Sequence, residues 1–223
     1  MSSAAAAVGP AHAAGAAPPA AGAPPLGVRL AYAGPALAFA VVGIPLYVFV
    51  PKFYTDVVGV PIAALGSILA AVRLFDAVID PPIGWLSDRT RTRFGRRRPW
   101  VLLGVLPLAA CLVALLSPPA MDPAQATLWF AASIFLVFLF WTVVTVPYEA
   151  LGPELSFDHH DRTALLGLRD GFLLVGTVLA VSAPLWIASW IDAPAGPAGE
   201  RARMAGIAAV YAPLLVALCV VCV

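Results

Sequence analysis

Long apolar runs constrain this chain more than any other feature of its sequence. A run of about 20 apolar residues can cross a bilayer as a helix, which satisfies its own backbone polar groups. The chain is 61% hydrophobic and only 11% charged, as is typical of polytopic membrane proteins. We therefore predict an all-α membrane protein, a six-transmembrane-helix bundle over residues 28–223, with helices near 29–50, 61–86, 99–117, 126–150, 168–191 and 204–223.

The first 27 residues differ in composition from the rest. They are almost entirely Ala, Gly and Pro, and they show no helical or strand periodicity. Such a segment cannot bury enough apolar surface to offset the entropy of ordering it. It also lacks the basic start of a secretion signal. We predict a disordered tail over residues 1–27.

The reactive side chains argue against several classes of function. The formal net charge is +1, and no basic surface suited to nucleic acid is evident. The three cysteines lie within apolar runs without metal-binding or redox spacing, so we interpret them as packing residues. An intramembrane serine protease needs a buried His, but the histidines, His12, His159 and His160, lie outside the apolar runs. We predict neither an enzyme nor a cofactor.

One apolar run carries three ionisable residues. Arg73, Asp76 and Asp80 lie within 61–86, and their spacing places them on one helix face. At about 1.5 Å per residue, they lie roughly 10–21 Å from the end of the helix, across the midplane. A charge there costs about 2.5–3.5 kcal/mol, so this face should avoid lipid. We interpret it as an ion or proton site; the alternative is a structural Arg–Asp pair, which does not need the second Asp.

The loop after this run determines the expected orientation. Six arginines fall within residues 89–98, whereas the neighbouring connections carry at most one basic residue each. Basic loops face the cytoplasm in most membrane proteins. We predict that this loop and both termini are cytoplasmic.

Four motifs resemble the glycoside–pentoside–hexuronide:cation symporters of the major facilitator superfamily, the group that includes the bacterial melibiose carrier. They occur in the family's order and spacing: FYTDVVG (53–59), RLFDAVIDPPIGWLSDRTRTRFGRRRPW (73–100), VPYEALGPELS (146–156) and DRTALLGLRDGF (161–172). The resemblance implies the N-terminal half of a twelve-helix major facilitator fold in a bacterial-type inner membrane. It also implies a partner, either a C-terminal six-helix half or a second copy.

The resemblance further implies cation-coupled symport of a small solute, a sugar or glycoside, by alternating access. Family members bind the coupling cation at positions that match Asp76 and Asp80, with Arg73 as the charge partner. Carboxylate oxygens suit Na⁺ or a proton, and sequence does not separate the two. We expect no other metal.

The arginine-rich loop is also similar to a general signature of the superfamily. In that resemblance it latches one half of the transporter against the other; the alternative is a loop that only sets topology. The matching positions are Gly84, Asp88, Arg89, Gly95, Arg96, Arg97 and Arg98.

The substrate positions depart from the melibiose carrier. Its acidic residue in the first helix corresponds to Ala40, and its acidic residue in the fourth helix corresponds to Thr145. The galactoside-binding carboxylates are therefore absent. We name as substrate or gating candidates Tyr47, Trp141, Thr145, Tyr148, Glu149, Arg169 and Asp170.

Other interpretations of these residues stay open. The aromatic residues can serve packing alone, and Glu149 can form an interhelical salt bridge with Arg169. The chain can also be a non-transporting, half-length assembly partner, or a symporter of a non-sugar solute such as a lipid-like molecule or an organic acid.

Overall fold

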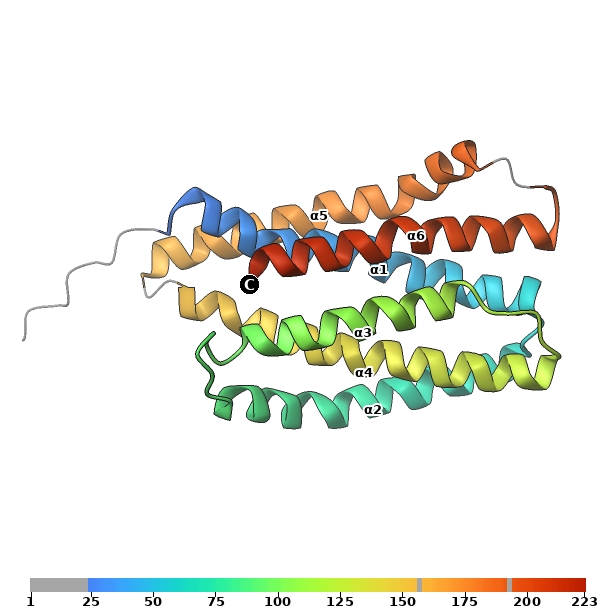
Figure 1. Cartoon of the computed structure of the whole chain (residues 1–223), viewed down its shortest axis with the longest axis horizontal. Helices are drawn as coiled ribbons and strands as arrows, with labels where there is room; N and C mark the ends of the chain where they lie inside the picture. Colours follow the sequence, from blue (N-terminus) through green and yellow to red (C-terminus); the bar gives the residue numbers. More distant parts are fainter. Residues whose placement is uncertain (1–23, 156–157, 192–193) are drawn as a thin grey trace, which may run out of the picture.

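The structure, a computed structural model, describes residues 24–155, 158–191 and 194–223 (Figure 1). Within these residues, six helices are long and apolar enough to cross a membrane. The predicted all-α fold is confirmed. The predicted tail falls mostly on residues 1–23, outside the described residues. The elements are α1 (Leu26–Phe53), η1 (Tyr54–Val58), α2 (Ile62–Arg89), α3 (Arg98–Leu116), α4 (Pro123–Leu155), α5 (His159–Trp190) and α6 (Pro197–Cys222).

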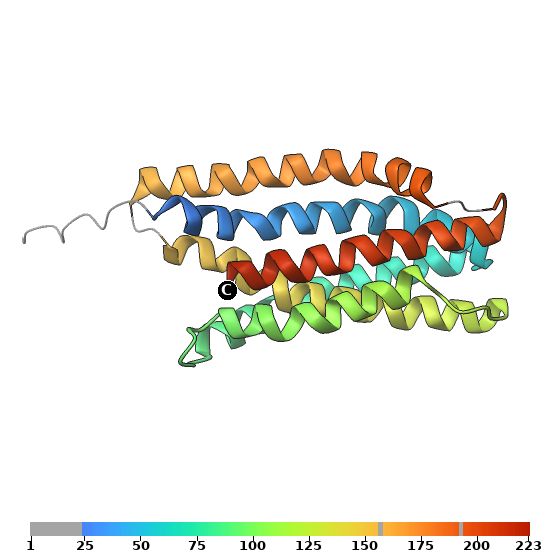
Figure 2. The same ribbon diagram turned by 45° about the horizontal axis from the view of Figure 1, so that its top comes forward.

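The helices run roughly side by side along one axis (Figures 1 and 2). Neighbouring helices pack in the order α5, α1, α6, α3, α4, α2. The α2–α3 loop, the start of α5 and the end of α6 lie at one end of the bundle (Figure 1). The α1–α2, α3–α4 and α5–α6 connections lie at the other end. This arrangement places α1 and α4 between flanking helices and leaves α2 and α5 at the two edges.

A π-helical turn ends the first span. Tyr54–Val58 follow α1 directly, and Gly59 closes the turn with a φ of 91°, which favours glycine. The buried Tyr54 hydroxyl donates a hydrogen bond to the Leu115 carbonyl at 2.7 Å. This bond fixes the end of α1 to the end of α3.

Several helices extend beyond the apolar runs that predicted them. The fifth helix starts at His159, not near 168, and the fourth continues to Leu155, not 150. The predicted connection between them is therefore mostly helical. A physical cause is visible at Asp158, whose carboxylate accepts hydrogen bonds from the backbone N–H groups of His160 and Asp161. This N-cap satisfies two amides that have no partner within the helix.

A glycine lets α1 and α5 approach closely. A Cβ atom on Gly176 of α5 would lie 2.5 Å from the Leu37 carbonyl oxygen of α1 and 2.9 Å from the Ala40 side chain. Ala40 is buried and Leu37 is half-buried, and a backbone atom cannot move away as a side-chain tip can. Small residues at such contacts are common between membrane helices.

We expect Gly176→Val to push α5 away from α1 and to destabilise the bundle by roughly 1–3 kcal/mol, because overpacking forces the backbone to shift. Gly167→Val is the matched control, since a Cβ there meets no atom within 4 Å. Thermal unfolding of both variants in detergent checks this expectation. Equal melting temperatures would contradict it.

We expect the Asp158 cap to make stability depend on acidity. Hydrogen bonds from the Asp161 and His160 amides hold the Asp158 pKa below its ordinary value. Its stabilisation is therefore complete above the ordinary pKa of about 3.9 and is lost as pH falls through the lowered pKa. Asp158→Asn keeps a capping oxygen without this titration. Melting curves from neutral to acidic pH should converge for the two proteins at the acidic end, and a constant difference would refute the assignment.

Candidate functional site

The charged stripe of α2 lies against aromatic residues of two other helices. The Arg73 Nη1 atom lies 3.5 Å from Asp76 Oδ2. The Arg73 guanidinium also stands 4.5 Å from the Tyr47 ring centroid and 5.0 Å from the Phe138 ring centroid. These distances are in the range of cation–π attraction, which partly compensates a cation that has left water.

The second carboxylate of the stripe contacts α4. The Thr142 hydroxyl donates a hydrogen bond to Asp80 Oδ1 at 3.0 Å. The Oδ1 atom of Asp76 is buried and has no hydrogen-bond partner among the described residues. The stripe on α2 thus presents two carboxylates, and Thr142 of α4 adds one hydroxyl oxygen. This ligand set suits a hard monovalent cation or a proton.

Sequence analysis missed Thr142. A signal was available, because Thr142 is one of few polar residues in the apolar part of the fourth helix and is itself buried. Its partner, however, is 62 positions away in sequence. Only the packing of α4 on α2 reveals the pairing.

Neighbouring helices bury fewer residues of α2 than its three charged side chains led us to expect. The buried residues of α2 are Leu65, Val72 and Ser87, and the Arg73 side chain is 54% exposed. Asp76 is better covered, at 16%. The six helices by themselves therefore leave part of the charged stripe open.

A cavity of about 340 Å³ lies between α1, α4 and α5. It brings together most of the predicted substrate residues. It also adds four residues that were not among the candidates, Ala36, Phe39 and Ala40 of α1 and Leu173 of α5. Tyr47 is not among the residues that line it and instead lies beside Arg73. The lining residues are Ala36, Phe39, Ala40, Trp141, Thr145, Tyr148, Glu149, Arg169, Asp170 and Leu173.

The ion pair in this cavity differs from the one considered from sequence. Arg169 Nη2 lies 2.9 Å from Asp170 Oδ1, within the same helix. No ion pair joins Arg169 to Glu149 among the described residues. The possible salt bridge between α4 and α5 is therefore not formed, and the Glu149 carboxylate remains in the cavity wall.

Aromatic packing holds one wall of the cavity in place. The Tyr148 hydroxyl donates to the Tyr32 carbonyl oxygen at 2.8 Å, and the two rings stack with centroids 5.3 Å apart. Phe39 packs against Tyr148 at 5.4 Å and against Trp141 at 5.3 Å. Tyr148 is thus buried mainly as a structural residue, while Trp141 is half-buried at the cavity.

The α4 helix connects this cavity to the charged stripe. Trp141 lines the cavity, and the next residue, Thr142, binds Asp80 on α2. Adjacent residues on a helix point to different faces. A displacement of α4 therefore moves Trp141 in the cavity wall and Thr142 beside Asp80 at the same time.

A network of charges joins the arginine-rich loop to the end of α4. The Arg97 side chain is only 12% exposed and contacts Asp88 at 2.7 Å and Glu154 at 3.3 Å. Arg96 contacts the same Glu154 carboxylate at 3.2 Å. Sequence analysis named the loop residues but missed Glu154, which lies 58 positions after Arg96.

The remaining loop positions have distinct local roles. Arg89 ends α2 and stacks on Trp85 at 3.7 Å, whereas Arg98 begins α3. Gly95 has a φ of 100°, a conformation that disfavours other residues. A Cβ on Gly84 would lie 3.7 Å from the Val146 side chain, an ordinary contact, so close packing does not explain this glycine.

Comparison with known proteins decides the family. The chain matches the family described as "MFS/sugar transport protein" over residues 31–223. It belongs to that family. Membership in the glycoside–pentoside–hexuronide:cation symporters of the major facilitator superfamily, expected from the motifs, is confirmed. Together with the six apolar helices, this membership shows an integral membrane protein.

Several relatives are named symporters or transporters. An uncharacterized symporter of Synechocystis, sll1374, is 37% identical over 85% of this chain and 36% of the relative. The inner membrane symporter YicJ of Escherichia coli is 34% identical over 75% of this chain and 36% of the relative. An isoprimeverose transporter of Lactiplantibacillus pentosus is 29% identical over 60% of this chain and 28% of the relative. The matched part of this family member thus spans about a third of each relative's length.

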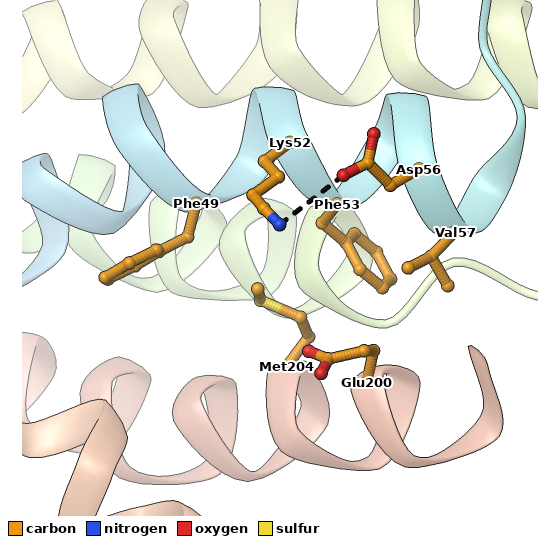
Figure 3. A pocket seen from close by; sticks show the side chains of 7 residues that line it. All are labelled: Phe49, Lys52, Phe53, Asp56, Val57, Glu200 and Met204. Carbon is orange, nitrogen blue, oxygen red and sulfur yellow. Dashed lines mark ion pairs between the residues drawn. The ribbon is translucent and has the colours of Figure 1, made fainter. Parts of the chain in front are cut away.

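A further cavity of about 340 Å³ lies at the other end of the bundle from the arginine-rich loop (Figure 3). Lys52 and Asp56 of the first span form an ion pair at 3.5 Å, and Glu200 and Met204 of α6 face them across the cavity. Lys52 and Asp56 are both exposed, so this pair contributes little to stability.

We expect Glu154→Ala to lower the free energy of unfolding by about 1–3 kcal/mol, because it leaves the poorly exposed Arg97 guanidinium with one partner fewer. Glu200→Ala, which breaks a more exposed pair within α6, should cost less than about 1 kcal/mol. Chemical unfolding in detergent gives both values. A smaller effect at Glu154 than at Glu200 would show that the loop network is not structural.

Proposed function

We propose that this chain forms part of a cation-coupled symporter that transports a sugar or glycoside together with Na⁺ or H⁺. The observation that carries the proposal is the adjacency of Trp141 and Thr142 on α4, which joins the solute cavity to the carboxylate stripe. The names of two relatives, an isoprimeverose transporter and a putative glycoside/cation symporter, support the substrate class.

The proposed cation ligands are Asp76, Asp80 and the Thr142 hydroxyl, with Arg73 as the charge partner. When the cation or a proton binds, it neutralises carboxylate charge, and the hydrogen bond between Asp80 and Thr142 weakens or reorganises. That change alters the position of α4 and hence of Trp141 in the cavity wall. Coupling of this kind requires only that each ligand binds one arrangement of α4 better than the other.

The proposed solute site is the cavity between α1, α4 and α5. Trp141 and Phe39 offer ring faces for the apolar face of a sugar. Glu149, Arg169 and Asp170 offer charged groups to its hydroxyls. Since Ala40 and Thr145 replace acidic residues of the melibiose carrier, recognition here depends on the α4–α5 charges instead.

We further propose that a second six-helix half covers the exposed edges of α2 and α5; the alternative occupant is a second copy of this chain. The uncovered part of the Arg73 stripe supports a partner, because a lipid-facing charge near the midplane is costly. Alternating access then moves the two halves around the cavity. The ion pairs of Arg97 with Asp88 and Glu154 hold the arginine-rich loop in place for its role as the latch between the halves. Both termini lie on the cytoplasmic side of an inner membrane.

Transport by the full-length protein in sealed vesicles tests the proposal. We expect the protein to accumulate at least one solute from a panel of glycosides when a Na⁺ or proton gradient is imposed across the vesicle membrane. Asp76→Asn and Asp80→Asn should each abolish accumulation without preventing insertion, because each removes a cation ligand. Asp56→Asn, an exposed carboxylate outside both sites, is the matched control.

Thr142 provides a graded version of the same test. Thr142→Val removes one of the three proposed oxygen ligands, and it should raise the half-saturating cation concentration about tenfold, which corresponds to a loss of about 1.4 kcal/mol in binding free energy. Thr142→Ser, which keeps the hydroxyl, should behave as the wild type. Accumulation that survives in both Asp variants would exclude the cation-site assignment.

A further inference from the structure

The six arginines of the α2–α3 loop fall into groups with different surroundings. Arg96 and Arg97 turn toward the bundle and pair with acidic residues. Arg98 begins α3, and Arg89, Arg91 and Arg93 lie before Gly95; none of these four forms an ion pair with an acidic side chain among the described residues. Their charge is therefore not used by the latch network, and it is available to an anion outside the bundle.

Exposed aromatic rings accompany these unpaired arginines. The Arg89 guanidinium lies 3.7 Å from the Trp85 ring centroid, and that of Arg93 lies 4.7 Å from the Phe94 ring centroid. Trp85 is 56% exposed and Phe94 is 62% exposed. Aromatic rings and basic groups side by side at the end of a membrane span are typical of the headgroup level of a bilayer.

A tight turn fixes Phe94 in its exposed position. The Thr92 hydroxyl donates to the Gly95 carbonyl oxygen at 2.6 Å, and the Phe94 amide donates to the Thr92 hydroxyl at 3.3 Å. The positive φ of Gly95 closes the turn. The ring is thus presented by a defined backbone.

An apolar groove of about 210 Å³ continues from the loop onto α3. Thr90, Pro99, Trp100 and Leu103 line it, and the Trp100 indole N–H donates to the Thr90 hydroxyl at 2.9 Å. Thr90 lies between Arg89 and Arg91 in the chain, so the groove opens next to the unpaired charges. Leu103 is 72% exposed and leads along the outer face of α3.

We propose that this surface is a binding site for an anionic glycerophospholipid. The phosphate binds the guanidinium groups of Arg91 and Arg93, which suit phosphate oxygens through paired N–H donors. The start of an acyl chain lies in the groove along Trp100 and Leu103, while Phe94 enters the headgroup layer. An anionic lipid fits better than a zwitterionic one because no acidic side chain pairs with these arginines among the described residues. The site is separate from the solute cavity and does not depend on the transport proposal.

Native mass spectrometry of the full-length protein, released from nanodiscs of equimolar phosphatidylglycerol and phosphatidylcholine, tests this site. We expect the wild type to retain phosphatidylglycerol preferentially. Arg91→Gln with Arg93→Gln should reduce that preference roughly tenfold, since basic residues near a membrane each add to the attraction of anionic lipid. Lys52→Gln with Arg162→Gln removes the same number of charges at exposed positions elsewhere and should change little.

Leu103→Trp fills the groove without changing charge and gives a second, independent variant. It should also reduce phosphatidylglycerol retention. Because Leu103 is 72% exposed, we expect this variant to fold like the wild type. Equal retention by the wild type, the Arg91/Arg93 double variant and Leu103→Trp would overturn the proposal. Equal loss in the Lys52/Arg162 control would also overturn it, because net charge alone would then explain binding.

Discussion

The hydrogen bond from the Thr142 hydroxyl to Asp80 joins the edge helix α2 to α4, and a ring contact between Phe75 and Phe135 supports the same interface. The α2 helix buries few residues, and its main packing partner is α4. The bond satisfies a carboxylate in the middle of this contact, where an unpaired polar group is costly. Together with the aromatic contacts of α4, it sets which face of α4 turns toward α2 and which face lines the solute cavity. Trp141 is held both by its own packing on Phe39 and by the bond that its neighbour Thr142 makes.

The presence of six membrane-spanning helices was predictable because a span depends on the local amino-acid composition. The apolar runs predicted each helix of the described chain, and the Arg73–Asp76–Asp80 spacing predicted one charged face. The start of α5 was not predicted, because it depends on a cap at Asp158 and not on hydropathy. Local signals of that kind are visible in a sequence but are weak in the presence of a dominant apolar pattern.

Site residues were predictable where a motif, an aligned position or an aromatic ring marked them. Four of the ten residues that line the cavity, Tyr148, Glu149, Arg169 and Asp170, lie in the motifs 146–156 and 161–172, whereas Phe39 lies in a helix without a polar landmark. Glu154 and Thr142 act through partners far away in sequence. Tyr47 was placed with the substrate residues because of its ring, but the packing of α1 places it beside Arg73. Contacts between residues far apart in the sequence form only when the bundle packs, so a single sequence does not show which residues pair.

The ion pair between Arg169 and Asp170 has a mechanical consequence. Both charges belong to α5, so the pair travels with the helix as a rigid body. Among the described residues, no ion pair joins α4 to α5, and sliding of one against the other requires no charge to be stripped of its partner. The resistance to widening of the cavity therefore comes from contacts of α5 with α1, which are the close approach at Gly176 and the ion pair between Arg29 and Asp161 at 3.5 Å. The α4–α5 side of the cavity can open without breaking an ion pair, whereas separation of α5 from α1 breaks one.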